Sequence, residues 1–560
     1  MDEMQLRSTL SALFCTTALL GSTFAAHSAS AAGARDPQLE ELRREMQEMR
    51  GQIKVLKARL GETETNVSDV RRARVAEAAR RAQISPGMAH DIRIGDAVTP
   101  GSGLGKSLSG VGTPPPDRGI VSSWLEFQAA NAKEESVHVG GVRIGFPGGR
   151  PTFSTDDGAY AFSVGLAFHE DFGGFFGQGA PRGNETGRAP GFTENTRRMR
   201  LFFSWRYKDW VANVTPDFGG SNEMAAGGSA TAQYLYEANL NYAGFKNTVL
   251  TVGYFQPRVT EEDSESSNDF MMMERPGITD VVRKIAAGDA RFSVGGMHYD
   301  KRWWIGAYFT GQSYGARAAN SATIDSQTGG TFRFAGRPIV TKDVDVHMGV
   351  SAISAFHPTL VGTSGTNSGA YNYGTLSETP ELNFGANGVA AALNNVSDIW
   401  AAGPELGIRY KDFLIKSEYY HIGVDRSHTT ANAYLPSYNF QGYYVAGNYT
   451  LFGTGRRYNI KEGAFSAPGV VSEFNPAAGQ WGALELSGRW SVTDLNDKGA
   501  GTTGMGGRET IWSGGLNWYP NRHFRVMVDY NRILLSHSPT SWATNGRDLN
   551  SFAARIQAAF

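Results

Sequence analysis

The sequence has little of what soluble proteins and helical membrane proteins are rich in. Charged residues make up only 19% of its 560 residues, which is low for a soluble protein. No run of 18 apolar residues occurs, and mean hydropathy is negative, so no membrane-spanning helix is expected. The formal net charge is −1, which gives no electrostatic reason to expect a nucleic-acid partner.

The chain has a single cysteine, and this residue lies in a segment that indicates export from the cytoplasm. Cys15 lies in a segment that combines a basic residue, an apolar stretch and a run of small residues, the pattern of an export signal. We predict that residues 1–31 are a signal peptide, so that the exported chain has no thiol. The residue before Cys15 is Phe14 rather than a small residue, which argues against lipidation.

Catalytic and metal-binding motifs are missing as well. No GxSxG, HExxH or Gly-rich phosphate loop stands in a supporting context, and the 11 histidines are scattered without partners at useful spacing. We therefore expect no enzyme activity, no cofactor and no metal site.

What the chain does have is glycine (69 residues), aromatic residues (11%) and many segments with a two-residue period. The segment RRMRLFFSWRY (197–207) shows the pattern best. From Met199 to Tyr207 one parity is apolar, and the other parity of the segment carries three guanidinium groups, which suits a membrane barrel with lipid outside and water inside. The apolar set is Met199, Leu201, Phe203, Trp205 and Tyr207, and the basic set is Arg198, Arg200 and Arg206.

The same alternation continues to the last residue, Phe560. A terminal aromatic residue on an alternating strand is the mark by which the barrel-assembly machinery recognises outer-membrane proteins. We predict an all-β fold, a transmembrane antiparallel β-barrel over residues 120–560. At roughly 27 residues per strand with its connections, this length gives about sixteen strands, and eighteen would also fit. A barrel of this size encloses an aqueous channel.

The N-terminal part has a different texture. Apolar residues recur at steps of 3 and 4 from Leu39 to Leu60, with charged residues between them, which predicts an α-helical coiled coil over 36–84. An amphipathic helix on the barrel rim is the alternative. Residues 85–119 are rich in Gly, Ser and Pro and read as a linker. We expect the coil to lie in the periplasm.

Strand parity also indicates which charges face the lumen. Basic residues outnumber acidic ones ten to five, which favours anions. The alternative is that the arginines pair with carboxylates across the lumen and stiffen the wall. The basic set is Arg143, Arg198, Arg200, Arg206, Arg409, Lys411, Lys416, Arg489, Arg525 and Arg555, and the acidic set is Glu126, Glu237, Glu418, Glu485 and Asp529.

A long segment from Glu261 to Asp289 mixes many charges with Phe270 and three consecutive methionines. Such apolar residues are unusual for a solvated loop. A loop folded back into the lumen as a constriction explains both features, with Glu274, Arg283 and Lys284 as its charged members. An external loop packed against the barrel or a neighbouring subunit is the alternative.

Several motifs resemble the phosphate-selective porin O and P family: RRMRLFFSWRYKDW, YEANLNYAGF, TVGYFQP, FMMMERP, WGALELSGRWSVTDLND, GGRETIWSGGLNWYPN and RVMVDYNR. The resemblance covers nearly the whole exported chain. It implies a sixteen-stranded, trimeric outer-membrane channel with anion preference and a constriction loop, and it suggests three helices for the coiled coil. One departure is that Gln256 and Arg258 stand in the stretch where many relatives have a lysine.

The predicted function is passive diffusion of small anions, with phosphate as a candidate, across the outer membrane of a Gram-negative bacterium. A general-diffusion or carbohydrate porin with little anion selectivity is the alternative. The expected partners are two further copies of the chain, outer-membrane lipid and lipopolysaccharide, and the barrel-assembly machinery. The candidate pore-lining and anion-binding residues are Arg198, Arg200, Arg206, Arg258, Arg275, Arg409, Lys411, Arg489, Arg525 and Arg555.

Overall fold

The computed structural model describes the part of the chain that forms the barrel. The predicted signal peptide, coiled coil and linker lie outside the described residues. Among the described residues, no helix is long and apolar enough to cross a membrane. The described ranges are 121–131, 136–146, 150–176, 192–219, 234–314, 327–358, 374–379, 381, 388–393, 395–426, 435–497, 505–536 and 548–560.

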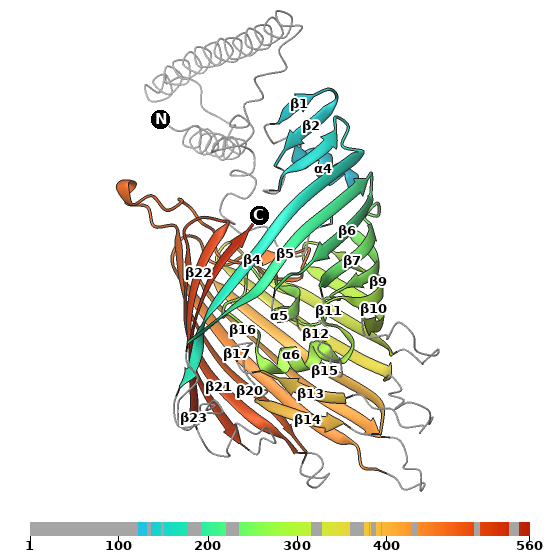
Figure 1. The fold of residues 1–560 in the computed structure, drawn as a ribbon, viewed down its shortest axis with the longest axis vertical. Helices are drawn as coiled ribbons and strands as arrows, with labels where there is room; N and C mark the ends of the chain where they lie inside the picture. The colour runs from blue at the N-terminus through green and yellow to red at the C-terminus, as the bar shows by residue number, and fades with distance from the viewer. Residues whose placement is uncertain are drawn as a thin grey trace, which may run out of the picture. The chain divides into compact units, whose positions relative to one another are not determined.

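Sixteen antiparallel strands form a closed barrel, as predicted (Figure 1). Each strand pairs with the next along the chain, and short turns alternate with longer loops, except that the connection of β17 to β20 (453–482) at the end with the short turns is long. The end with short turns is the periplasmic end in outer-membrane barrels. The strands are β4 (Tyr160–Phe176), β5 (Thr193–Tyr207), β6 (Trp210–Pro216), β7 (Leu235–Tyr242), β8 (Thr248–Phe255), β9 (Arg291–Tyr299), β10 (Trp303–Ser313), β11 (Thr328–Val340), β12 (Val344–His357), β15 (Val396–Tyr410), β16 (Phe413–Arg426), β17 (Tyr438–Phe452), β20 (Ala483–Asn496), β21 (Met505–Tyr519), β22 (Phe524–Ser536) and β23 (Asp548–Ala559).

The barrel closes where the last strand meets the first. β23 pairs with β4 from Asn550 opposite Phe176 to Ala559 opposite Ala167. Phe560 then exchanges two backbone hydrogen bonds with Leu166, at 2.8 and 3.1 Å. A closed sheet has no edge strand. This matters in a membrane, because lipid cannot form hydrogen bonds with the unpaired backbone N–H and C=O groups of an edge.

The expected alternation holds along most strands. On β22, Phe524, Val528 and Tyr530 are exposed on the outer face, whereas Arg525 and Asp529 are buried on the inner face. Apolar side chains therefore meet lipid and charged ones meet the lumen, as a membrane barrel requires.

A short N-terminal unit precedes the barrel wall. It consists of helix α4 (Trp124–Asn131) and strands β1 (Val137–Val139), β2 (Val142–Gly145) and β3 (Thr152–Thr155). β3 pairs with the first residues of β4, and the wall itself begins at Tyr160. Two residues that strand parity assigned to the lumen therefore lie elsewhere: Glu126 is on α4 and Arg143 is on β2.

Three segments fill the interior of the barrel. The first is the β8–β9 loop (256–290), which contains α5 (Glu261–Ser264) and α6 (Gly277–Ala286); Figure 1 shows both helices among the strands of the wall. The second is a hairpin of β13 (Gly374–Glu378) and β14 (Val389–Leu393). The third is the first half of the β17–β20 segment (453–482), with β18 (Tyr458–Asn459) and β19 (Ala464–Phe465). The second half of this segment, with the 3-10 helix η3 (Pro476–Ala478), is exposed.

The β8–β9 loop is packed as tightly as a protein core. Every side chain from Val259 to Met273 is at most 3% exposed. Two apolar clusters hold the loop in place. Met271 and Met272 belong to one together with α6, and Met273 packs with Phe175, Ile511 and neighbouring wall residues in the other. The methionines thus anchor the loop inside the barrel.

Candidate functional site: the interior of the barrel

Two consecutive arginines of β5 face the lumen because the strand carries a β-bulge. His169 of β4 pairs with Arg198 and Glu170 pairs with Thr196, so Arg197 is the extra residue. Both arginine side chains are buried, at 3% and 1% exposed. A bulge changes which face its extra residue meets, whereas strict alternation would place Arg197 on the lipid side.

Glu274 of the β8–β9 loop ties the second strand of the barrel, β5, to the last, β23. Its carboxylate accepts two hydrogen bonds from Arg197 (2.8 and 3.0 Å) and one from Arg555 of β23 (2.7 Å). Arg555 also binds Asp171 of β4 at 2.6 and 2.7 Å. Burial alone would raise the pKa of Glu274, but Arg197 and Arg555 outweigh it and hold this pKa below its usual range.

Arg200 makes a second junction between wall and loop. It donates to Asp217 at the end of β6 (2.7 Å) and to Asp289 of the β8–β9 loop (3.3 Å). Its guanidinium carbon lies 3.6 Å from the ring centre of Tyr236. Tyr236 reaches this position through a register shift between β6 and β7, although alternation alone would place it on the lipid face.

Wall and turn arginines also hold the backbone of the β8–β9 loop. They donate hydrogen bonds to successive carbonyl groups between residues 268 and 274, so this stretch is fixed along the wall formed by β20, β22 and β23. A carbonyl acceptor is neutral and leaves the charge of its arginine in place, but three of the four arginines also pair with carboxylates: Arg456 with Glu485, Arg489 with Glu381, and Arg555 with Asp171 and Glu274. The pairs are Arg525 with Asn268 (2.9 Å) and Phe270, Arg456 with Asp269 (2.5 Å), Arg555 with Met273 (2.6 Å) and Arg489 with Glu274 (2.7 Å).

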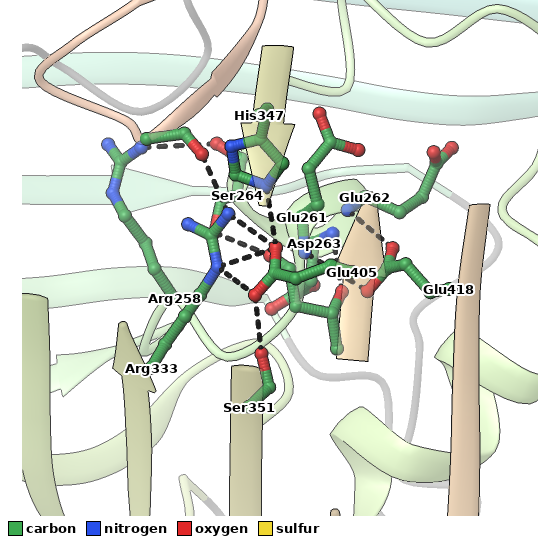
Figure 2. Close-up of polar contacts among 12 residues, drawn as sticks. Arg258, Glu261, Glu262, Asp263, Ser264, Arg333, His347, Ser351, Glu405 and Glu418 are labelled. Atoms are coloured by element: carbon green, nitrogen blue, oxygen red, sulfur yellow. Dashed lines mark hydrogen bonds and ion pairs between the residues drawn. The ribbon is translucent and has the colours of Figure 1, made fainter. Parts of the chain in front are cut away.

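An acidic cluster lies at α5, on the side of β16. Oxygens of Glu261, Glu262 and Glu265 all lie within 4.8 Å of one another. The ammonium of Lys416 pairs with all three, at 3.1 Å from Glu261 and 2.6 Å from Glu265. Lys416 thus supplies the positive charge that a metal ion would otherwise bring. Nearby, Glu418 accepts from the backbone N–H groups of Glu261 and Glu262, as Figure 2 shows.

Arg333 of β11 joins the wall to two of the interior segments. It pairs with Glu405 of β15 (2.7 Å) and donates to Ser264 of α5 (3.0 Å) and to the carbonyl of Gly463 (2.7 Å). Figure 2 shows Glu405 at the centre of this network, in contact with His347 as well. These bonds satisfy a buried charge and fix the β17–β20 segment against the β8–β9 loop.

Three predicted pore-lining residues lie at the periplasmic end. Arg206 donates to the carbonyls of Ser122 and Lys208. Arg409 donates to the carbonyl of Lys411. Lys411 itself is exposed in the turn between β15 and β16, with φ of 54°, so strand parity does not apply to it.

The other predicted residues lie on the β8–β9 loop. Arg258 donates to the carbonyl of Ser264 (3.1 Å), and Lys284 of α6 donates to the carbonyl of Ser377 in the hairpin (3.2 Å). Arg283 pairs with Asp263 (2.8 Å) and Asp289 (2.6 Å), and Arg275 lies 3.6 Å from Asp263. These cations thus connect parts of the loop with one another and with the hairpin.

Four buried arginines were not among the predicted site residues. The alternation in TFRFAG could have identified Arg333, and a bulge hides Arg197. Arg291 stands where β9 begins, and Arg456 lies in the β17–β20 segment, where no period gives a signal.

The charge balance of the interior differs from the ten basic and five acidic residues that strand parity assigned to the lumen. Among the described residues that are buried, 12 are Lys or Arg and 18 are Asp or Glu, because the interior segments bring many carboxylates. Not all of these are charged at neutral pH. Burial and the neighbouring Glu462 raise the pKa of Asp269 to about 8.

A polar cavity of about 70 Å³ lies between β6–β8 and the start of the β8–β9 loop. Three amide side chains on its wall are hydrogen-bonded in a row, Asn213 to Asn239 (3.3 Å) and Asn241 to Asn239 (2.5 Å). Val121 and Lys461 also line the cavity, together with Glu237 of β7 and Arg258 of the β8–β9 loop. The cavity therefore has a carboxylate on the wall side, one cation on the loop and another beside the N-terminal unit.

Residues 162–560 match the family described as phosphate-selective porin O and P. The chain belongs to this family. The porin family places the barrel in the outer membrane of a Gram-negative bacterium and makes it a channel rather than an enzyme. The predicted family and the predicted sixteen strands are both confirmed.

Several solved structures are similar to this chain. A loop L8 deletion mutant of OmpT from Vibrio cholerae is 12% identical with a TM-score of 0.41, over 71% of this chain and 99% of that one. The channel DcaP of Acinetobacter baumannii is 10% identical with a TM-score of 0.41, over 73% and 99%. An anion-selective porin from Comamonas acidovorans is 9% identical with a TM-score of 0.41, over 72% and 100%. No protein with a curated description matches the chain.

Proposed function

We propose that this porin lets small anions diffuse passively across the outer membrane, with phosphate as a candidate solute. The observation that carries the proposal is Arg525 of β22, which donates to two backbone carbonyls. A guanidinium group bonded to neutral acceptors keeps a positive potential in the lumen, which lowers the entry barrier for anions. Its neighbours Arg489 and Arg555 each donate to one carbonyl as well, but they also pair with carboxylates, Arg489 with Glu381 and Arg555 with Asp171 and Glu274.

A general-diffusion or carbohydrate porin with little anion selectivity is the second candidate. It is favoured by the ion pairs of Arg197, Arg333 and Arg555 with carboxylates and by the excess of buried acidic residues. In that case the arginines would serve mainly to hold the β8–β9 loop.

The assembly forms part of the same proposal. We infer a homotrimer whose apolar outer faces contact outer-membrane lipid and lipopolysaccharide. Phe560 would be the residue that the barrel-assembly machinery recognises. Its ring lies 4.7 Å from His523 and 5.7 Å from Phe524, so the chain end is packed on the periplasmic turn before β22.

The reversal potential of the refolded full chain in a planar bilayer, across a KCl gradient, tests the proposal. We expect chloride preference, and a reduced chloride current when phosphate is added at low concentration. A cation preference, or equal permeability together with no response to phosphate, would support the general porin instead.

A further inference from the structure

The N-terminal unit is attached to the periplasmic end of the barrel by polar contacts. The backbone N–H of Trp124 donates to Asp209 in the β5–β6 turn (2.7 Å). Arg206 donates to the carbonyl of Ser122 (2.9 Å), and its guanidinium lies 4.6 Å from the ring centre of Phe127. Residues 121–131 are therefore fixed beside this end of the wall.

One ion pair connects this unit to the interior of the barrel. Glu126 of α4 pairs with Lys461 of the β17–β20 segment at 3.0 Å. Ser123 prepares the carboxylate for this contact, because its N–H donates to Glu126 (2.9 Å) and its hydroxyl accepts from the N–H of Glu126 (3.2 Å). This is a capping box, which fixes both the start of α4 and the position of the carboxylate.

Lys461 lies at a position where its own movement would change the contacts between the segments inside the barrel. It lines the polar cavity beside Val121, and its carbonyl accepts from Trp304 of β10 (3.2 Å). The next residues, Glu462 and Gly463, contact Arg258 and Arg333. Releasing Lys461 would therefore loosen the contacts between the β17–β20 segment and the β8–β9 loop.

Helix α4 is suited to detachment. Asn131 is its one buried residue, and Leu125 is 74% exposed. Trp124 and Phe127 are its two partly buried large apolar side chains, so detachment of α4 would expose a limited apolar area, and elements held by few apolar contacts open at low free-energy cost.

We propose that residues 121–131 are a latch at the periplasmic mouth of the channel. With Glu126 on Lys461, the latch holds the β17–β20 segment against the β8–β9 loop and keeps the polar cavity beside β6–β8 from widening into a channel. When α4 moves away, the segment is released and the channel conducts. This inference rests on the proposed function, because a latch needs a channel to close.

Charge reversal in the full chain tests the latch by single-channel recording. We expect Glu126→Lys and Lys461→Glu each to raise the ratio of open to closed channels by up to about fivefold, the amount an exposed ion pair contributes. The double variant should return to the wild-type ratio. Heat-dependent migration on a gel would establish that each variant is folded, and Glu126→Gln is a milder variant should a reversal fail to fold.

The pair Arg508–Asp494 is a matched control. Its exposed fractions, 47% and 20%, are close to the 45% and 23% of Glu126 and Lys461, but it joins β20 and β21 at the loop end. Reversing either of its charges should leave the open ratio unchanged. If wild-type channels conduct and the latch variants match them, or if the double variant does not recover, the latch is wrong. If the folded wild type never conducts, the proposed function fails instead.

Discussion

Arg555 of the last strand and Glu274 of the β8–β9 loop form an ion pair 2.7 Å long. Arg197 binds both oxygens of the same carboxylate, so one loop residue neutralises arginines from β5 and β23. The pair joins the loop to the strands on both sides of the closure between β4 and β23. The loop's position and the integrity of the barrel are therefore coupled at this point.

Replacing Glu274 by Gln should loosen the β8–β9 loop and also destabilise the barrel. Two buried guanidinium groups would lose their shared carboxylate, and breaking a buried ion pair costs about 3–5 kcal/mol. We expect a lower temperature for the heat-dependent shift in gel migration, together with faster proteolysis within the loop. Glu473→Gln makes the same change at an exposed position and should have no effect. An unchanged transition temperature in the Glu274 variant would contradict this role.

Arg525 offers the clearest test of anion preference, because its described acceptors are carbonyls rather than carboxylates. Arg525→Gln removes the charge and should shift the reversal potential towards equal permeability. Arg525→Lys keeps the charge but loses the fork that binds two carbonyls, so it should keep the selectivity while loosening the loop. If both variants change selectivity equally, loop position rather than charge sets the preference.

Lys416 should be replaceable by a metal ion. Lys416→Met would leave the carboxylates of Glu261, Glu262 and Glu265 close together without a cation. Oxygen ligands at this spacing suit Ca²⁺, so we expect Ca²⁺ present during refolding to raise the thermal stability of this variant. The wild type and Lys416→Arg, which keep a protein cation in place, should not respond. A Lys416→Met variant that is equally stable with and without Ca²⁺ would contradict the prediction.

The strand faces could be predicted from the sequence wherever alternation was unbroken. Arg198, Arg200, Arg489, Arg525 and Arg555 all lie on the inner face as their parity indicated. Parity failed at β-bulges, because one extra residue reverses the phase of the strand. For this reason Arg197 and Tyr236 face the lumen, and no feature of their own sequence shows it.

The partners of the charges could not be predicted. Arg555 binds Asp171, which is 384 residues away in the chain, and Arg525 binds the backbone of a loop whose path depends on the whole barrel. The unusual methionines did indicate that the β8–β9 loop leaves solvent, since apolar residues need a surface to pack on. That the first half of the β17–β20 segment also enters the lumen could not be predicted, because this segment lacks both periodicity and an apolar run.

Acid should release the latch through Glu126. Burial raises the pKa of this carboxyl, but the hydrogen bonds from Ser123 and the contact with Lys461 outweigh it, so the pKa lies below its ordinary value of 4.5. The pair is therefore fully present at neutral pH and is lost as pH falls through that lowered pKa. We expect the ratio of open to closed channels to rise as pH falls below about 4.5. In Glu126→Gln this rise at acid pH should be absent. The variant therefore distinguishes the contribution of Glu126 from that of other carboxylates that titrate in the same range. The charged neighbours of this pair are Lys461, Arg206 and Lys208, which stay cationic throughout, and Asp209, the carboxylate that accepts from the N–H of Trp124. An identical acid response in the wild type and in Glu126→Gln would assign the change to other groups of the lumen.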